Sequence, residues 1–515
     1  MRPSHWGVSP RLLLLLGCLS WGCGTPSLEG PLVGYEADSL ACDRIAGAEP
    51  MNIAEQIERA GITDSTATWA YVLEEGEEAI FTRAWLGQNS ERSIDIQYFI
   101  FSMDNVGIIA LDYLLRAADR GVKVRMLVDD IMLDVSEEDV LALSAHPNFE
   151  IRIYNPNPGK NGFQKVIHAA RDFRGFNQRM HNKTFIVDGR VAITGGRNIA
   201  DEYFDYDQEY NFRDRDVMLI GAAAATIQQS FESFWSHPLA VEVDGSAAVE
   251  ADHRLALYDQ IHAYACDPDN FWPEIRTMIA GIPQAIPRIQ SSGRLHRLDD
   301  LQFVSDVPGK NASDGFYGGG RSTSALVDLV EKSRESLMIQ SPYLVLTDEG
   351  IALFESAVNR GVKVTILTNS LCSTDNLEAF SGYRRIRERL LSAGVEVYEY
   401  RPDAAIRTKL ITATKQQRSG YLPTFGLHAK SMVVDHATTV IGTFNLDPRS
   451  ANLNTECVAI MRSKSMSQQV ESLMFLELEP ENAWRTTADE NPDHHAGWWK
   501  LLTTWIRGVV PEHLL

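Results

Sequence analysis

Hydrophobic and polar positions follow the same order twice along the chain. Residues 92–128 begin with the alternation typical of a strand, continue with an amphipathic helical pattern, and end in a second strand entered through Gly121. Residues 334–367 repeat this order, and the sequence Arg-Gly-Val-Lys-Val at 120–124 recurs at 360–364. Parallel strands joined by a helix place helices on the faces of a sheet. The pattern therefore predicts two α/β domains of one design, each a mixed β-sheet flanked by helices.

The stretch between the two repeats differs in composition. Residues 246–320 are rich in proline and glycine, as in the string GIPQAIPRI, which favours a connector. The predicted organisation is a first domain over 56–245, a connector over 246–320 and a second domain over 321–515. The 515 residues exceed one ordinary core, and 44% hydrophobic with 23% charged residues is a globular composition.

The N-terminus has the pattern of an export signal. Two arginines precede an apolar run that is shorter than the roughly 20 residues of a spanning helix, and small residues and a cysteine follow. The pattern is similar to bacterial lipoprotein signals, in which the cysteine after the cleavage site is acylated. Cys23 and Cys18 both fit, and Cys23 is favoured because it follows the fuller hydrophobic region. We expect a signal peptide over 1–22, a tether over 23–55 and attachment to membrane through a lipid anchor.

Two copies of one polar motif carry the candidate chemistry. The pattern HxKxxxxD, followed by glycine and asparagine, occurs once in each predicted domain with the same internal spacing. Its residues are His181, Lys183, Asp188, Gly195 and Asn198 in the first copy, and His428, Lys430, Asp435, Gly442 and Asn445 in the second. One octet is weak evidence, because a lone histidine is more often a structural core residue. Two copies in a duplicated scaffold indicate a shared function.

The motif suits transfer at a phosphate. If the octets are strands, the histidine and lysine of each copy lie on one face of the strand and can bind the same phosphate. A neutral imidazole attacks phosphorus, and a protonated one gives its proton to the leaving alcohol. The lysines neutralise charge on the non-bridging oxygens, and Asn198 and Asn445 add amide donors. Asp188 and Asp435 end apolar strands and fit a structural role as well as a chemical one. This chemistry needs no metal ion or other cofactor.

Charge limits the classes of partner that the chain can bind, and cysteine spacing limits its metal sites. Lys and Arg total 48 against 69 Asp and Glu, and the net charge of −21 disfavours a nucleic-acid coat. The six cysteines form no CxxC pair and no zinc-ligand spacing. Arg171, Arg174 and Arg179 precede His181 and fit either a path for anionic lipid head groups or a solvated basic face.

The doubled motif resembles the signature of the phospholipase D superfamily. Strings such as DVPGK at 306–310 and NLDPRSANLNTE at 445–456 are similar to those of bacterial cardiolipin synthases of the type C group. The resemblance implies two phospholipase D-like domains related by a pseudo-twofold, with the active site between them. It also implies a phosphohistidine intermediate, with His181 as nucleophile and His428 as general acid and then base, or the reverse. The resemblance also implies that an acidic residue after the asparagine of one domain orients the histidine of the other domain. Asp216 occupies this place in the first domain and Glu456 in the second.

The expected activity follows from the same resemblance. It is phosphatidyl transfer that makes cardiolipin from phosphatidylglycerol and a second phospholipid. The alternative is hydrolysis of phospholipids to phosphatidic acid by a phospholipase D-type phosphodiesterase, or less favourably of nucleic acid by a nuclease. The expected partners are phospholipid substrates and a membrane, without nucleic acid. The expected location is the bacterial cell envelope, at the periplasm-facing outer membrane, because no aspartate retention signal follows either cysteine.

The chain ends in an apolar stripe at helical spacing. The stripe consists of Trp498, Trp499, Leu501, Leu502, Trp505, Ile506, Val509 and Val510. It fits a helix packed on the core as well as a helix lying in a membrane interface.

Overall fold

A computed structural model gives the arrangement of the chain. It describes residues 52–59, 61–62, 64, 66–130, 133–156, 177–245, 251–267, 270, 285–311, 318–411 and 423–507. The predicted signal peptide with Cys18 and Cys23, most of the tether, Arg171, Arg174, Val509 and Val510 lie outside these residues. None of the helices in the described ranges combines the length and the hydropathy needed to traverse a bilayer.

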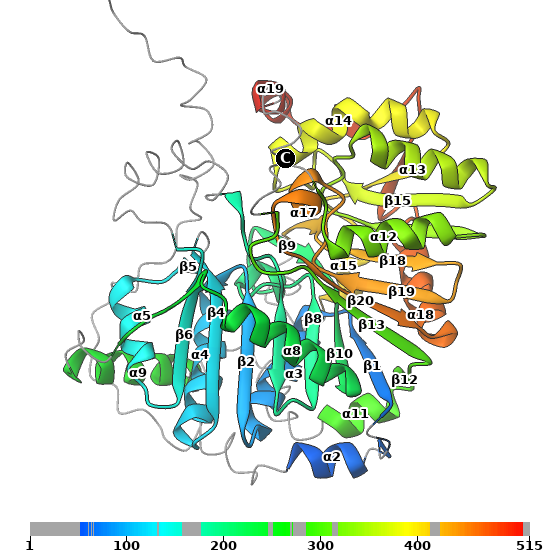
Figure 1. Ribbon diagram of the computed structural model, residues 1–515. Helices are drawn as coiled ribbons and strands as arrows, with labels where there is room; N and C mark the ends of the chain where they lie inside the picture. Colours follow the sequence, from blue (N-terminus) through cyan, green and yellow to red (C-terminus); the bar gives the residue numbers. More distant parts are fainter. Residues whose placement is uncertain are drawn as a thin grey trace, which may run out of the picture.

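The first domain is built on a nine-stranded mixed sheet (Figure 1). In spatial order its strands are β11 (Ala240–Glu242), β6 (Phe149–Tyr154), β4 (Lys123–Asp129), β2 (Ser93–Tyr98), β7 (Thr184–Val187), β8 (Val191–Gly195), β10 (Asp216–Gly221), β1 (Thr68–Leu73) and β12 (Leu295–Arg297). Strands β2, β4 and β6 run parallel, and the other neighbours are antiparallel. The predicted strand–helix–strand unit is β2, α4 (Asn105–Asp119) and β4.

The second domain repeats this order in an eight-stranded sheet. Its strands are β13 (Asp300–Ser305), β20 (Cys457–Arg462), β19 (Thr438–Gly442), β18 (Ser431–Val434), β14 (Ser336–Gln340), β15 (Lys363–Asn369), β16 (Glu396–Tyr400) and β21 (Ala483–Thr486). Strand β14, α13 (Asp348–Asn359) and β15 form the second strand–helix–strand unit, and β14, β15 and β16 are parallel. The predicted fold class, two mixed sheets flanked by helices, is confirmed.

Local sequence explains how these units begin and end. The side chain of Asp104 accepts a hydrogen bond from the amide of Gly107 at the start of α4, and Thr347 accepts one from Gly350 at the start of α13. Both helices run into the repeated Arg-Gly turn, where Gly121 has φ 94° and Gly361 has φ 92°. Left-handed values of this kind favour glycine, so the turn sequence is repeated for a conformational reason.

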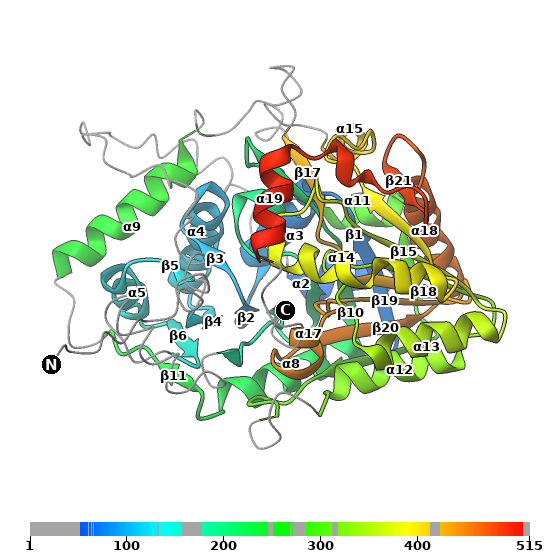
Figure 2. The same cartoon turned by 90° about the horizontal axis from the view of Figure 1, so that it is seen from above.

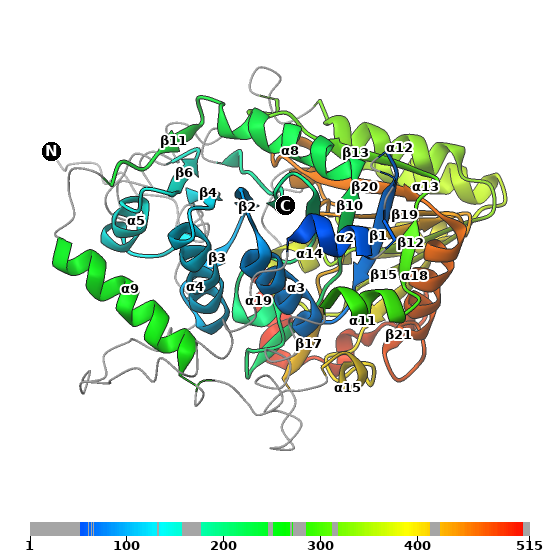
Figure 3. The same cartoon turned by 90° about the horizontal axis from the view of Figure 1, so that it is seen from below.

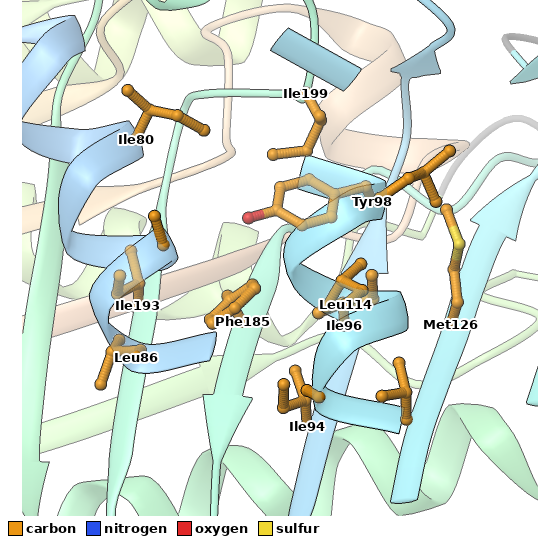
Figure 4. Close-up of a cluster of buried hydrophobic side chains, with 14 of the residues drawn as sticks. Ile80, Leu86, Ile94, Ile96, Tyr98, Leu114, Met126, Phe185, Ile193 and Ile199 are labelled. Atoms are coloured by element: carbon orange, nitrogen blue, oxygen red, sulfur yellow. The ribbon is translucent and has the colours of Figure 1, made fainter. Parts of the chain in front are cut away.

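The two sheets face each other across a core that also contains two helices, and other helices cover their outer faces. One core lies between the first sheet and the helices α3 (Gly76–Asn89) and α4, and Figure 4 shows part of it. A second core joins the inner faces of both sheets with α8 (Ala222–Trp235) and α18 (Lys464–Leu476). A third lies between the second sheet and α12 (Arg321–Lys332), α13 and α14 (Leu377–Ser392). The views from above and below show the two domains side by side around this shared centre (Figures 2 and 3).

The segment predicted as a connector is part of both domains. Helix α9 (Ala251–Cys266) packs on α4 and on α5 (Glu137–Ser144), β12 extends the edge of the first sheet, and β13 extends the edge of the second. The prediction of a separate linker over 246–320 was therefore wrong for this portion. Proline and glycine indicate turns, but strands β12 and β13 are set by partners far away in the sequence. Cys266, at the end of α9, is disulfide-bonded, whereas Cys372 and Cys457 are free.

Candidate active site

The two motif segments enter their sheets in the same way. His181 and Lys183 lie in an extended segment, and strand β7 begins only at the next residue, Thr184. His428 and Lys430 likewise precede β18. The prediction that the whole octet is a strand was wrong at its N-terminal end. The lysine still lies with its histidine, because Lys183 Nζ donates to the carbonyl of His181 at 2.9 Å and Lys430 Nζ to that of His428 at 2.6 Å.

His181 is held by the second domain. Its Nδ1 lies 2.8 Å from Oε2 and 3.1 Å from Oε1 of Glu456. Its backbone amide donates to the carbonyl of Thr455, and the ring of Phe99 contacts the imidazole edge to face at 5.0 Å between centroids. The residue is 7% exposed. The contact expected between Glu456 and the opposite histidine is therefore present.

His428 is held by the first domain in the reciprocal way. Its Nδ1 lies 2.5 Å from Oδ2 of Asp214, and its backbone amide donates to the carbonyl of Arg213. The main chain before it, β17 (Thr424–Leu427), pairs with β9 (Tyr210–Arg213) across the domain boundary. The rings of Tyr203 and Phe212 flank the imidazole. Each histidine is thus oriented by an acid from the opposite domain.

The acid beside His428 is Asp214, and the prediction of Asp216 was wrong. Asp216 Oδ2 lies 2.8 Å from Arg83 Nη2, and its Oδ1 accepts from the amide of Arg197. The two aspartates are two residues apart, so alternation along the chain cannot separate them. Asp214 alone lies directly after β9, the strand that pairs with the segment leading to His428.

The glycines after the first octet make room for these carboxylates. An added Cβ at Gly196 would lie 2.1 Å from Asp214 Oδ1, and one at Gly195 would lie 2.2 Å from Asp216 Oδ1. Such approaches exclude any side chain at either position. The Gly-Gly pair therefore leaves the space in which both carboxylates lie.

The motif asparagines differ in how they are bound. The Oδ1 of Asn198 accepts a hydrogen bond from the amide of Ile100 at 3.1 Å. The Oδ1 of Asn445 is buried and meets no hydrogen-bond partner within the described parts of the chain. Both side chains are buried, at 1% and 5% exposure. Their binding of a substrate phosphate stays a prediction.

Asp188 and Asp435 bind the main chain, which supports the structural one of the two roles that the sequence left open. Asp188 accepts backbone hydrogen bonds from residues 91, 92 and 93, and Asp435 from residues 334, 335 and 336. Both have left-handed backbones, with φ 54° and 50°. Each follows its motif strand and binds the chain where β2 or β14 begins.

Burial and the lysines set the charge of the site. Burial, Lys183 and Lys430 lower the pKa of His181 well below its ordinary value. Burial and Lys430 also lower the pKa of His428 to about 4, against the opposing effect of Asp214. Because Lys430 of the second domain acts on His181 of the first, the two motifs share one electrostatic environment.

The two acids differ in charge. Burial opposes ionisation of Asp214, but His428 and Lys430 outweigh it and hold the pKa of Asp214 below its usual range. Burial raises the pKa of Glu456 to about 7, against the charge of Lys183. Asp214 is therefore a fixed anion at neutral pH, whereas Glu456 titrates near neutrality. Burial also lowers the pKa of Lys183 to about 7 and that of Lys430 to about 8.

Comparison with known proteins assigns this arrangement to a family. The profile of the family described as "Cardiolipin synthase, PLD-like domain" matches residues 87–235 and 326–475, one match in each domain. The chain belongs to this family. Cardiolipin synthase C of Escherichia coli K12 is 33% identical over 437 residues, which cover 81% of this chain and 86% of that protein. An uncharacterized protein of Helicobacter pylori is 31% identical over 88% of this chain and 86% of its own length.

A solved structure shares the fold of this phospholipase D-like enzyme. The crystal structure of phosphatidylserine synthase from Haemophilus influenzae Rd KW20 matches 89% of this chain and 100% of that one, with a TM-score of 0.55 and 13% identity. The doubled sheet is therefore common to both proteins.

Sequence reasoning missed several residues of this PLD-like site. Arg213 and Arg215 flank Asp214, and both bind the buried carboxylate of Glu74, which fixes the segment that presents Asp214. Thr443 Oγ1 donates to Glu456. The string FRDRD signals such a segment, because alternating arginine and aspartate in an apolar context require partners. Within the described chain, no group of three or more His, Cys, Asp or Glu side chains is placed to hold a metal ion.

Arg179 does not lie on a solvated basic face. Its side chain is buried, and Nη1 lies 3.4 Å from Oδ1 of Asp129. Its backbone carbonyl accepts from the amide of Thr455, next to the bridge between Met180 and Thr455. Arg179 therefore helps to hold the segment that leads to His181.

Proposed function

We propose that the protein is a phosphatidyltransferase that makes cardiolipin. The phosphatidyl group comes from a phospholipid donor, and the glycerol head group of phosphatidylglycerol is the acceptor. The observation that carries the proposal is the reciprocal pairing of His181 with Glu456 and of His428 with Asp214. This pairing provides two oriented imidazoles, with two buried lysines beside them, in a member of the cardiolipin synthase PLD-like family.

The proposed reaction has two displacements at one phosphorus. In the first, Nε2 of His181 forms a bond to phosphorus, the bond from phosphorus to the head-group oxygen breaks, and His428 gives its proton to the departing alcohol. In the second, His428 takes the proton from the hydroxyl of phosphatidylglycerol as its oxygen attacks phosphorus. The N–P bond then breaks, and His181 returns to its starting form. Lys183 and Lys430 stabilise the charge on the non-bridging oxygens.

The charges of the two acids support this assignment of the histidines. Burial and Lys430 lower the pKa of His428 to about 4, and the fixed anion of Asp214 opposes this shift, so Asp214 favours the imidazolium that a proton donor requires. Glu456 has a pKa of about 7 and supports positive charge on His181 less strongly. The pKa of His181 itself lies well below its ordinary value, which keeps this imidazole neutral and nucleophilic.

The proposal includes a place in the cell. The sequence pattern of the first 22 residues supports export and acylation at Cys23, or at Cys18, and therefore a lipid anchor in the bacterial envelope. The lack of an aspartate after either cysteine supports the outer membrane, facing the periplasm. Such an anchor keeps the enzyme beside its lipid substrates.

Product analysis with the purified full chain tests the proposed function. Radiolabelled phosphatidylglycerol, with and without phosphatidylethanolamine, is expected to yield labelled cardiolipin, and His181→Ala is expected to abolish it. A donor labelled at its phosphate should leave an acid-labile, alkali-stable label on the protein, absent in His181→Ala. Phosphatidic acid as the sole product would identify a hydrolase instead, and cardiolipin made by His181→Ala would refute the proposed nucleophile.

A further inference from the structure

The C-terminal helix presents its apolar face to solvent. Helix α19 (Trp498–Arg507) carries five large apolar residues that are exposed. They are Trp498 at 72%, Trp499 at 62%, Leu502 at 40%, Trp505 at 73% and Ile506 at 38%. These positions recur at the spacing of one helix face. Of the two arrangements that the sequence left open, burial on the core does not apply to these five side chains.

The opposite face of α19 fastens the helix to the second domain. Lys500 Nζ donates to the backbone carbonyls of Cys372 and Thr374, at 3.3 and 3.2 Å. Arg507 pairs with Glu378 in the first turn of α14, and Thr504 is buried at 1% exposure. Figures 1 and 2 show α19 beside α14, and in Figure 1 the helix lies at the upper edge of the molecule. The helix is thus attached by its polar side and by Leu501, which packs against the third core, while the five apolar side chains named above stay exposed.

The attachment point of α19 also leads to the active site. The loop bound by Lys500 contains Ser373, whose carbonyl accepts a hydrogen bond of 2.6 Å from the hydroxyl of Tyr210. Tyr210 packs against Phe212, and Phe212 packs against His428 at 4.7 Å between ring centroids. A continuous series of contacts therefore runs from α19 to the wall beside His428.

We propose that this face of α19, formed by Trp498, Trp499, Leu502, Trp505 and Ile506, docks on the surface of a phospholipid bilayer and holds the site of the second domain against it. This inference rests on the proposed function, because the substrates are then lipids of that bilayer. Three of the ten tryptophans of the chain lie on the face, and indoles favour the head-group region, where the ring is apolar and the N–H meets water.

The net charge argues that the apolar face, and not electrostatic attraction, provides the binding. At −21 the chain is repelled by anionic lipid. Docking through α19 should therefore stay the same or strengthen as salt screens this repulsion, whereas binding by a basic patch would weaken steeply as salt is added.

The test uses the full chain with Cys18→Ser and Cys23→Ser, so that acylation cannot attach it to membrane. Flotation with vesicles of phosphatidylcholine and phosphatidylglycerol measures docking. The variant W498S/W499S/W505S is expected to bind these vesicles about 10-fold or more weakly, because it removes three indoles from the apolar contact. Quenching of tryptophan fluorescence by brominated phosphatidylcholine should be strong in the parent chain and largely lost in this variant.

Activity on two forms of substrate separates docking from chemistry. Turnover of phosphatidylglycerol in vesicles should fall with binding, whereas turnover of a short-chain phosphatidylglycerol below its critical micelle concentration should stay unchanged. Phe475→Ser provides the matched control, because Phe475 is also an exposed apolar side chain, at 49%, but lies on α18, on another side of the molecule (Figure 1). This control should bind and turn over like the parent. A melting curve equal to that of the parent shows that each variant is folded.

The inference is overturned if the triple variant floats as well as the parent, or if both substrates are turned over less by the same factor. Light scattering tests whether a second copy of the chain occupies this face instead of a bilayer. A parent dimer that becomes a monomer in the triple variant, with unchanged vesicle binding, also overturns the inference. If the parent turns over neither lipid, the proposed function fails, while flotation and quenching still decide whether α19 docks.

Discussion

Asp214 of the first domain binds the imidazole of His428 in the second, with Oδ2 2.5 Å from Nδ1. The contact favours the tautomer of His428 that carries its proton on Nδ1, and it leaves Nε2 directed away from the acid. It also stabilises the imidazolium. Glu456 makes the reciprocal contact with His181. These two hydrogen bonds cross the domain boundary in opposite directions, so the orientation of both rings depends on how the domains pack.

Substituting Asp214 should reduce catalysis without unfolding the protein. Asp214→Asn keeps the shape of the side chain but favours the wrong tautomer of His428, and we expect turnover to fall by about 10²- to 10⁴-fold. Steady-state rates and melting curves check this. Asp216→Asn is the matched comparison, because it leaves the buried Arg83 unpaired and should lower the free energy of unfolding by about 3–5 kcal/mol. The reverse pattern, with turnover lost in a stable Asp216→Asn and kept in Asp214→Asn, would restore the assignment of Asp216.

The pH dependence of activity should have an acid limb near pH 7 that belongs to Glu456. Burial raises the pKa of this carboxyl to about 7, so the acceptor for His181 Nδ1–H is ionised above that pH and lost as the pH falls through it. A protonated Glu456 would then donate to Nδ1 and place the imidazole proton on Nε2, where it blocks attack. Rates measured between pH 5.5 and pH 8 should show the limb, and Glu456→Gln should be slower but lack it. The same limb in Glu456→Gln would assign it to another group.

Anion binding should weaken as the pH rises. Burial lowers the pKa of Lys183 to about 7 and that of Lys430 to about 8, so both lose their charge on going from pH 6 to pH 9. Sulfate keeps its charge over this range, and its inhibition constant should increase by about 10-fold or more as charged hydrogen-bond donors are lost. Lys430→Arg stays charged and should flatten the dependence. A constant that does not vary with pH in the parent would contradict these pKa values.

The aspartates that end the octets should affect stability alone. Asp188→Ala removes the acceptor for the backbone amides of residues 91–93, and we expect the free energy of unfolding to fall by about 1–3 kcal/mol. Asp188→Asn should lose less, since asparagine tolerates the left-handed backbone and keeps one acceptor oxygen. Urea unfolding measures both changes. Turnover per folded molecule should stay at the level of the parent, and a large loss of turnover in a stable Asp188→Asn would return this residue to the chemistry.

The sequence predicts what is repeated and local, and it fails where distant main-chain pairing decides. The repeated strand–helix–strand units were predictable from periodicity and from the Arg-Gly turn. The choice between Asp214 and Asp216 was not, because it depends on the pairing of β9 with β17 across the domains. Strands β12 and β13 were missed for the same reason. The apolar stripe of α19 was visible, but which of its sides meets the protein depends on polar anchors such as Lys500.

The reciprocal holding of the histidines has a consequence for biogenesis. A chain that has folded only its first domain has a His181 without Glu456 and an Asp214 without His428, and a truncated product has the same defect. In either case the imidazole of His181 lacks the carboxylate that orients it, so the paired site is absent. The crossed contacts therefore make a competent site depend on a fully synthesised chain whose two domains have packed together.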